Sequence, residues 1–151
     1  MDRTDANLSE ARADIKAEMA RTDSKASLLL AFNGAALAGL WTVATGLKLP
    51  MAALVVGGLG AAGLVAAVAL LLSAVRPRLG GHDRGSFPYW ARLTPEQVLE
   101  EMREDRRALR VVVLSQIALT KFARLQRAVD ITRGAGALLL VAVGIAVGGA
   151  L

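Results

Sequence analysis

The sequence predicts an all-α integral membrane protein: a tight transmembrane hairpin, a cytoplasmic helical layer and a third, C-terminal transmembrane helix. Between Lys25 and Lys48 lie 22 residues without a formal charge, and between Lys48 and Arg76 lie 27 more. A helix needs about 20 apolar residues to cross the hydrocarbon core, so each run is long enough to span. A chain of 151 residues is too short to bury two such helices on all sides in a soluble core.

The hairpin occupies residues 26–75, and only Lys48, Leu49 and Pro50 separate its two apolar runs. Because proline can start a helix but cannot continue one, this turn is predicted to be short. Hydrophobic residues make up 54% of the chain, a share that is typical of a membrane protein rather than a soluble basic domain.

The distribution of charge predicts the orientation. Of the 18 Lys and Arg residues, five precede Ala26, one is Lys48, and twelve fall between Arg76 and Arg133. The positive-inside rule therefore places the N-terminus and the segment 76–133 of this multi-pass protein in the cytoplasm. The net charge of +5 lies mostly beside the membrane, which indicates contact with lipid headgroups and not with a nucleic acid polymer.

Residues 1–25 are predicted to form a cytoplasmic amphipathic helix that continues into the first span without an intervening Gly or Pro. Asn7 followed by Glu10 offers a capping-box start for this helix. Its first residues mix acids with bases and lack an apolar core, so no cleaved signal peptide is expected.

The cytoplasmic layer continues with a loop over residues 76–93, in which glycines and short polar residues are frequent. At its end, Thr94 is placed to cap a helix, with Pro95 at the first position and Gln97 completing a capping box. No Gly or Pro occurs from there to Arg133, so one long cytoplasmic helix is expected over residues 94–133.

The last 18 residues, 134–151, are uncharged and are predicted to form the third transmembrane helix, with an interfacial or re-entrant segment as the alternative. Small residues recur in all three spans and permit close helix packing, within one chain or in a homo-oligomer. Asn33 is the strongly polar residue at depth in the first span. Its amide needs a partner, either on another helix or in a pore.

The residues do not predict an enzyme, a metal site or a cofactor. His82 is the only histidine, and the chain has no cysteine, so catalytic triads and His- or Cys-rich metal clusters are excluded. The carboxylates at Glu100, Glu101, Glu104 and Asp105 alternate with arginines, which is typical of a solvated helix face.

A ligand site in the cytoplasmic layer is the more specific hypothesis. Arginine forks suit phosphate oxygens, and aromatic rings stack on bases. Lys121 interrupts an apolar stripe and therefore needs a partner, a bound anion or a route to the edge of the layer. Topology, headgroup contact and interfacial anchoring are the alternative explanations for these residues. The candidate ligand-binding residues are Arg76, Arg78, Tyr89, Trp90, Lys121, Arg124 and Arg127.

The opening of the first span resembles a known family. Residues 20–30 read Ala-Arg-Thr-Asp-Ser-Lys-Ala-Ser-Leu-Leu-Leu, with Asn33 and Gly34 just beyond. This segment resembles the corresponding motif of the Pycsar system effector family, transmembrane type, at Asp23, Lys25 and Asn33. The resemblance continues through residues 76–79, 87–90 and 93–97. It resumes at residues 121–128, where Phe122 stands in place of the usual tyrosine.

This resemblance implies an antiphage membrane effector of the bacterial inner membrane. In such systems a partner cyclase makes a cyclic pyrimidine mononucleotide, cyclic UMP or cyclic CMP, and the effector then impairs the membrane and causes abortive infection. Relatives are also often labelled integral membrane plasmid transfer proteins. The alternative function is therefore a structural or plasmid-transfer-associated membrane protein that binds partner proteins through its cytoplasmic helix.

Overall fold

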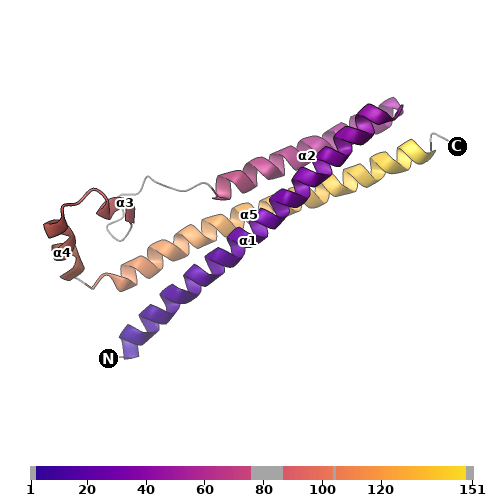
Figure 1. Ribbon diagram of the computed structural model, residues 1–151. Coiled ribbons are helices and arrows are strands. Elements are labelled where there is room, and N and C mark those ends of the chain that lie inside the picture. The colour runs from indigo at the N-terminus through magenta and orange to yellow at the C-terminus, as the bar shows by residue number, and fades with distance from the viewer. Residues whose placement is uncertain (1–2, 76–86, 104, 149–151) are drawn as a thin grey trace. The chain divides into compact units, whose positions relative to one another are not determined.

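The computed structural model describes residues 3–75, 87–103 and 105–148, and within these ranges every regular element is an α-helix (Figure 1). Three helices contain a stretch long and apolar enough to cross a membrane: α1, α2 and α5. This confirms the predicted fold class. The helices are α1 (Arg3–Gly46), α2 (Met51–Val75), α3 (Phe87–Trp90), α4 (Pro95–Arg103) and α5 (Arg107–Gly148).

The chain divides into two compact units. The charged unit comprises Met1–Thr22 and Arg76–Phe122, and the apolar unit comprises Asp23–Val75 and Ala123–Leu151. The long helices α1 and α5 each contribute their first part to the charged unit and their second part to the apolar unit.

The turn between α1 and α2 is as short as the sequence predicts. Helix α1 ends at Gly46 and α2 begins at Met51. Pro50 stands just before α2, where its missing N–H costs no helical hydrogen bond. Its carbonyl accepts the N–H of Leu54 at 3.1 Å, which closes the first turn of the helix.

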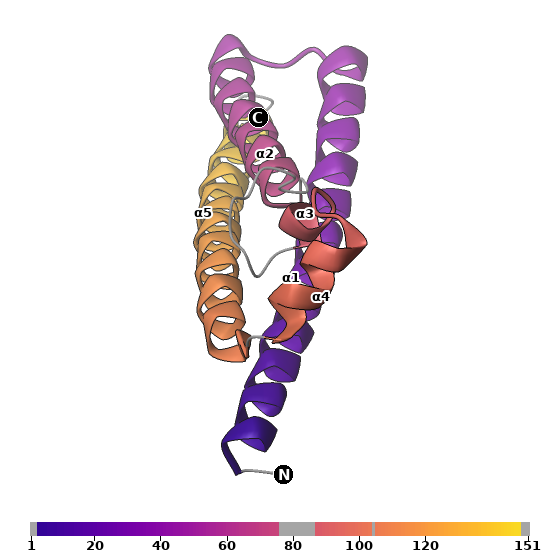
Figure 2. The same ribbon diagram turned by 90° about the vertical axis from the view of Figure 1, so that its left-hand side faces the viewer.

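In the apolar unit, α2 runs beside the second parts of α1 and α5 (Figures 1 and 2). All three helices contribute to one buried cluster, formed by Ala26, Leu71 and Ala128. Around this cluster pack four further leucines, Leu29, Leu30, Leu70 and Leu125. Large side chains on the outer faces are exposed, Leu28 by 73% and Trp41 by 74%, as expected of helices that face lipid.

Glycines allow α2 to approach α5 closely. A Cβ atom at Gly60 would lie 2.8 Å from Cγ of Leu139 and 3.2 Å from the carbonyl oxygen of Ala135. At Gly63 it would lie 3.0 Å from Cβ of Ala135. These two glycines therefore belong to a packed interface between helices of one chain. Packing within one chain was one of the two possibilities predicted for the small residues, the other being contact between chains of a homo-oligomer.

Two expectations about helix boundaries are wrong. Helix α1 begins at Arg3, so Asn7 and Glu10 lie inside it and do not cap its start. Asp5 in the first turn instead places a negative charge near the positive end of the helix dipole.

The single helix expected over residues 94–133 is two helices, because α4 ends at Arg103 and α5 begins at Arg107. Asp105, one residue before the N-cap position, supports the new start, since its Oδ1 accepts the backbone N–H of Arg107 at 3.1 Å. Helix α5 then continues without a break through the third apolar stretch. The side chain of Asp105 thus satisfies the first helical N–H of α5 at a start that no Gly or Pro marks.

The predicted start of α4 is confirmed. The backbone N–H of Thr94 donates to Oε1 of Gln97 at 2.9 Å, and the N–H of Gln97 donates to Oγ1 of Thr94 at 3.4 Å. This is the reciprocal capping box that the sequence indicates. Hydrogen bonds from its own backbone N–H and from Thr94 also hold the pKa of Glu96 below its usual value.

Candidate ligand site

An arginine and a tryptophan stack in the charged unit. Cζ of Arg110, on the first turn of α5, lies 4.5 Å from the centroid of the Trp90 ring, which ends α3. Both residues are half-buried. Attraction between a guanidinium and an indole face contributes about 0.5–1 kcal/mol at exposed sites and more where water is excluded. The contact therefore fixes α3 against α5 and holds a cation beside an aromatic surface.

Next to this pair, Glu101 of α4 is fully engaged. Its Oε1 accepts the hydroxyl of Tyr89 at 3.2 Å, and its Oε2 forms an ion pair with Arg106. The side chains of Arg106 and Glu101 are only 17% and 18% exposed, so water screens this pair weakly. The polar group of Tyr89 is thereby used for structure, within a network that joins α3, α4 and the start of α5.

Arg107 joins α1 to α5 in the same unit. Its Nη2 lies 2.6 Å from Oδ1 of Asp5 and 2.9 Å from Oδ2 of Asp105. Hydrogen bonds from the side chain and the backbone N–H of Arg107 hold the pKa of Asp105 below its usual value. The hydrogen bond to Asp105 likewise raises the pKa of Arg107. The two carboxylates at this junction are thus both paired with Arg107.

Arg12 of α1 is half-buried and, unlike Arg107, has no acidic partner among the described residues. Burial, and after it the positive charge of Arg12, lower the pKa of Arg110, whereas Asp105 raises it. The positive charge of Arg12 therefore acts together with burial on the pKa of Arg110, whose guanidinium stacks on the ring of Trp90.

Sequence reasoning did not select Arg12 or Arg110, although a signal for Arg12 was present. Leu8, Ile15 and Met19 form the apolar stripe of α1, and Arg12 occupies the position in that stripe between Leu8 and Ile15. This is the same kind of interruption that drew attention to Lys121 on α5. Arg110 has no comparable signal, because it stands at the end of a run of charged residues.

The predicted ligand residues are distributed over both units. Arg76 and Arg78 lie outside the described residues. Tyr89, Trp90 and Lys121 belong to the charged unit, and Lys121 is half-buried on α5.

Arg124 and Arg127 belong to the apolar unit. Nη1 of Arg124 donates to the backbone carbonyl of Ser73 at 2.8 Å, near the C-terminus of α2, where a positive charge is favoured by the helix dipole. Arg127 is exposed. Arg124 therefore has a structural partner on α2, and the seven predicted residues are not gathered into one described cluster.

Of the motif positions, Asn33 has the clearest role. Its side chain is fully buried, and its Nδ2 donates to Oγ1 of Thr132 on α5 at 3.1 Å. This is the interhelical partner that the amide was expected to need. The backbone carbonyl of Asp23 accepts the hydroxyl of Ser27 at 3.0 Å, and the side chain of Lys25 is exposed.

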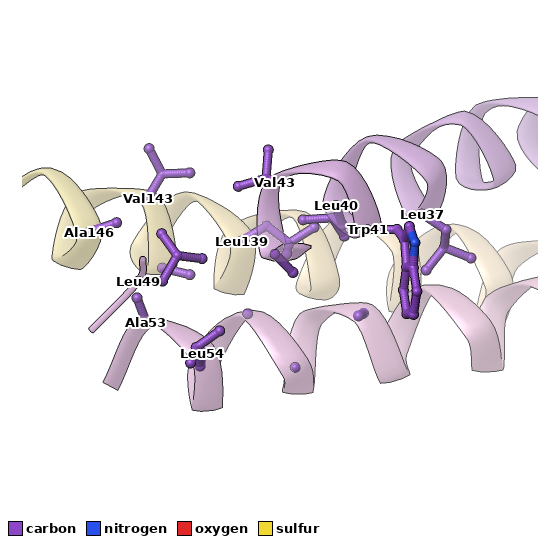
Figure 3. Close-up of a pocket in the computed structure, with 15 residues that line it drawn as sticks. Leu37, Leu40, Trp41, Val43, Leu49, Ala53, Leu54, Leu139, Val143 and Ala146 are labelled. Carbon is purple, nitrogen blue, oxygen red and sulfur yellow. The ribbon is translucent and has the colours of Figure 1, made fainter. Parts of the chain in front are cut away.

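The apolar unit contains a cavity of about 310 Å³ between α1, α2 and α5 (Figure 3). No charged residue lines it, so it cannot hold a phosphate group. It suits only an apolar occupant. The lining residues are Leu37, Leu40, Trp41, Val43, Ala44, Leu49, Ala53, Leu54, Gly57, Gly58, Ala61, Leu139, Ala142, Val143 and Ala146.

Across residues 3–75, 87–103 and 105–148, no group of three or more His, Cys, Asp or Glu side chains is arranged to hold a metal ion. The chemistry that these residues offer is binding of anions by guanidinium groups and stacking on an indole.

Comparison with known proteins gives one match. A family model described as the Pycsar effector protein domain matches residues 7–148. No curated protein and no solved structure matches the chain. The matched segment covers α2, α5, all but the first four residues of α1, and the charged unit from residue 7 onward.

Proposed function

The chain belongs to the Pycsar effector family, a family of membrane effectors, and on that basis we propose how this antiphage effector works. It senses a cyclic pyrimidine nucleotide, cyclic UMP or cyclic CMP, made by a partner cyclase, and it then impairs the integrity of the bacterial inner membrane. Loss of the membrane barrier stops growth of the infected cell before phage is released.

The observation that carries this proposal is the family match over residues 7–148 together with three apolar helices in the same segment. The division of the chain supports it further. One unit offers guanidinium groups and an indole, which suit a phosphate and a base. The other offers helices whose outer faces are apolar.

We place the charged unit in the cytoplasm, where a cyclase product accumulates, because the Lys and Arg residues concentrate there. We infer that the ligand is sensed by cations and aromatics of this unit. Of the residues predicted from the sequence, Tyr89, Trp90 and Lys121 belong to it, whereas Arg124, which donates to the carbonyl of Ser73, and Arg127 belong to the apolar unit.

Membrane damage requires that several chains act together in this proposal. Within a single chain the amide of Asn33 is buried and hydrogen-bonded to Thr132, and Gly60 and Gly63 of α2 pack against α5. The exposed apolar side chains, such as Leu28, Phe32 and Leu140, offer surface for contact between copies. A homo-oligomer that rearranges on ligand binding would open the bilayer along such contacts.

The test is expression of the full chain in bacteria with an active pyrimidine cyclase, with an active-site variant of that cyclase, or with a purine cyclase. Membrane potential is followed with a potential-sensitive dye. Depolarisation with the active pyrimidine cyclase only is the expected result. Depolarisation in all three strains would remove the sensing step, and an intact potential in all three would favour a structural or plasmid-transfer-associated role.

A further inference from the structure

We propose that the cavity between α1, α2 and α5 binds one acyl chain of an anionic phospholipid, and that Lys48 holds the phosphate of the same lipid. The proposal depends on the apolar unit lying in a bilayer, as its apolar helices and the family match indicate. It does not depend on nucleotide sensing. It gives the protein a lipid site at the end of the apolar unit where α1 turns into α2.

The lining of the cavity excludes a polar occupant. Among the described residues that line it, the indole N–H of Trp41 is the only polar side-chain group, and the other residues are Leu, Val, Ala and Gly. A buried water molecule needs two to four polar partners, so water is not stable in this space. In a bilayer, the hydrocarbon that can fill it is the acyl chains of the lipids around the helices.

The cavity extends along the helices from the turn into the bilayer. Leu49, in the turn, lies toward one end of the lining, and Leu37 and Trp41 lie toward the other (Figure 3). The lining residues of α2, from Ala53 to Ala61, cover about 12 Å at 1.5 Å per residue. One leaflet contributes half of a hydrocarbon core of about 30 Å. The cavity therefore covers most of the depth of one leaflet.

The volume of the cavity selects a narrow occupant. It measures about 310 Å³. A single turn of an α-helix, about 5.4 Å long and at least 10 Å wide with its side chains, has a larger volume, so no further helix fits inside. A second copy of the chain can therefore only cover the opening. A linear acyl chain is narrow and flexible, and it suits a space that is elongated along the helices.

Lys48 supplies the charge that an anionic headgroup needs. It is exposed, and it directly precedes Leu49 of the lining. It is the only charged residue in 26–75, and residues 134–151 carry no charge, so no acidic side chain at this end of the apolar unit can pair with it. Lysine side chains near the ends of membrane helices extend to the interface, where the lipid phosphates lie. One lipid can therefore place its phosphate at Lys48 and an acyl chain in the cavity.

The test measures quenching of the fluorescence of Trp41 by brominated lipids. The full chain is placed in nanodiscs of phosphatidylcholine with a small fraction of lipid brominated in its acyl chains, either phosphatidylglycerol or phosphatidylcholine. A Trp90→Phe background leaves Trp41 as the only tryptophan. Trp41 lines the cavity and is also 74% exposed, so the surrounding lipid quenches it equally in both cases, and the difference reports the bound lipid. Brominated phosphatidylglycerol is expected to bind beside Trp41 about fivefold more strongly than brominated phosphatidylcholine, the factor expected for one basic residue at an anionic surface.

Four variants examine the two parts of the site. Lys48→Gln should abolish the preference for phosphatidylglycerol, whereas Lys48→Arg keeps the charge and should retain it. Ala146→Phe should also abolish the preference, because Ala146 is half-buried and lines the cavity, so a ring there takes up part of the space. Val147→Phe is the matched control, since Val147 is the next residue on α5, is 60% exposed and does not line the cavity. Helix content and elution volume are measured for each variant, so that a loss of folding is not read as a loss of binding.

Each outcome decides the proposal. A preference that is lost in Lys48→Gln and Ala146→Phe and kept in Lys48→Arg and Val147→Phe supports it. Equal binding of the two brominated lipids by the unsubstituted site overturns it, because the cavity then takes hydrocarbon without regard to the headgroup. A preference that survives Lys48→Gln or Ala146→Phe also overturns it, since the phosphate is then held elsewhere or the chain lies outside the cavity. Quenching of Trp41 by neither lipid would mean that a second copy covers the cavity. None of these results changes the depolarisation expected with an active pyrimidine cyclase, so the proposed function is tested separately.

Discussion

The charged and apolar units hold their helices together by different means. In the charged unit, α1, α3, α4 and α5 are joined through polar side chains: Arg107 with Asp5, Glu101 with Tyr89 and Arg106, and Arg110 with Trp90. In the apolar unit the contacts are small residues and leucines, with Asn33 donating to Thr132 and Arg124 donating to the carbonyl of Ser73 between helices.

This difference follows from the two solvents. In water, burial of apolar surface drives helices together, so polar contacts serve mainly to select one arrangement. In a bilayer the lipid tails are as apolar as leucine, so association depends on close packing and on scarce hydrogen bonds. Charged side chains of the charged unit can therefore remain solvated or paired, as Arg107 is with Asp5 and Asp105, which the middle of an apolar span does not allow.

The sharpest way to break this comparison is to place a charge in the apolar unit. Asn33→Asp is expected to destabilise the protein by about 3 kcal/mol, the usual cost of an acidic group in the middle of a membrane helix. Asn33 is fully buried and hydrogen-bonded to Thr132, so an ionised carboxylate there cannot reach water. The measurement is the fraction of folded protein recovered from membranes and its thermal midpoint in detergent.

Asn33→Leu is the matched variant. It removes the hydrogen bond but also removes a buried polar group, and such bonds in membrane proteins contribute only about 0.6 kcal/mol on average. It should therefore behave much like the wild type. If Asn33→Asp were as stable as the wild type, the site of Asn33 would be wet, and the boundary between the two units would have to move.

The charged and apolar units also differ in how well the sequence predicts them. The sequence predicted the apolar runs, the turn at Pro50 and the need of Asn33 for a partner. These features are predictable because helix length, charge and a single buried amide are strong constraints in lipid. The capping box at Thr94 was readable because it is local. The sequence did not predict the break between α4 and α5. No Gly or Pro marks it, and the side chain of Asp105 accepts the N–H of Arg107 at the new start.

The candidate site was the least predictable part. The sequence marked Trp90, but its partner Arg110 lies twenty residues further along and reaches it only through tertiary structure. Arg12 belongs to the other long helix, α1. Residues that meet only through tertiary structure have no characteristic spacing in the sequence, so the contact of Arg110 with Trp90 could not be predicted.

A smaller effect is expected from a pair of glycine variants in α2. Gly60→Ala should destabilise the apolar unit by about 1–3 kcal/mol, because the new methyl group would overlap Leu139 and press on the carbonyl of Ala135. Leucine can change rotamer, but the carbonyl belongs to the backbone of α5, so the two helices must separate. The thermal midpoint of the purified protein in detergent reports the change.

Gly58→Ala provides the control on the same helix. A Cβ atom at Gly58 meets nothing within 4 Å, so this variant should be neutral or slightly more stable, since alanine is the better helix former by about 1 kcal/mol. Equal destabilisation by the two substitutions would mean that glycine acts through backbone flexibility and not through the contact with α5.

The smallest effect is expected in the charged unit, from a substitution of Asp105. Hydrogen bonds from Arg107 depress the pKa of this carboxylate in the folded protein, so folding favours the ionised form. The resulting stability is present above the unfolded pKa of about 3.9 and is lost as the pH falls through the lower folded-state pKa. Asp105→Asn keeps an oxygen that can cap α5 but removes the charge.

The expected result is a difference between wild type and Asp105→Asn that depends on pH. At neutral pH, hydrogen exchange of the amides at the start of α5 should be slower in the wild type, and, after correction for the intrinsic exchange rate, the difference should shrink as the pH falls below the unfolded pKa of about 3.9. Other carboxylates, including Glu96, titrate in both proteins and cancel in the comparison. A difference that stayed constant from pH 7 to pH 3 would show that Asp105 acts only as a cap.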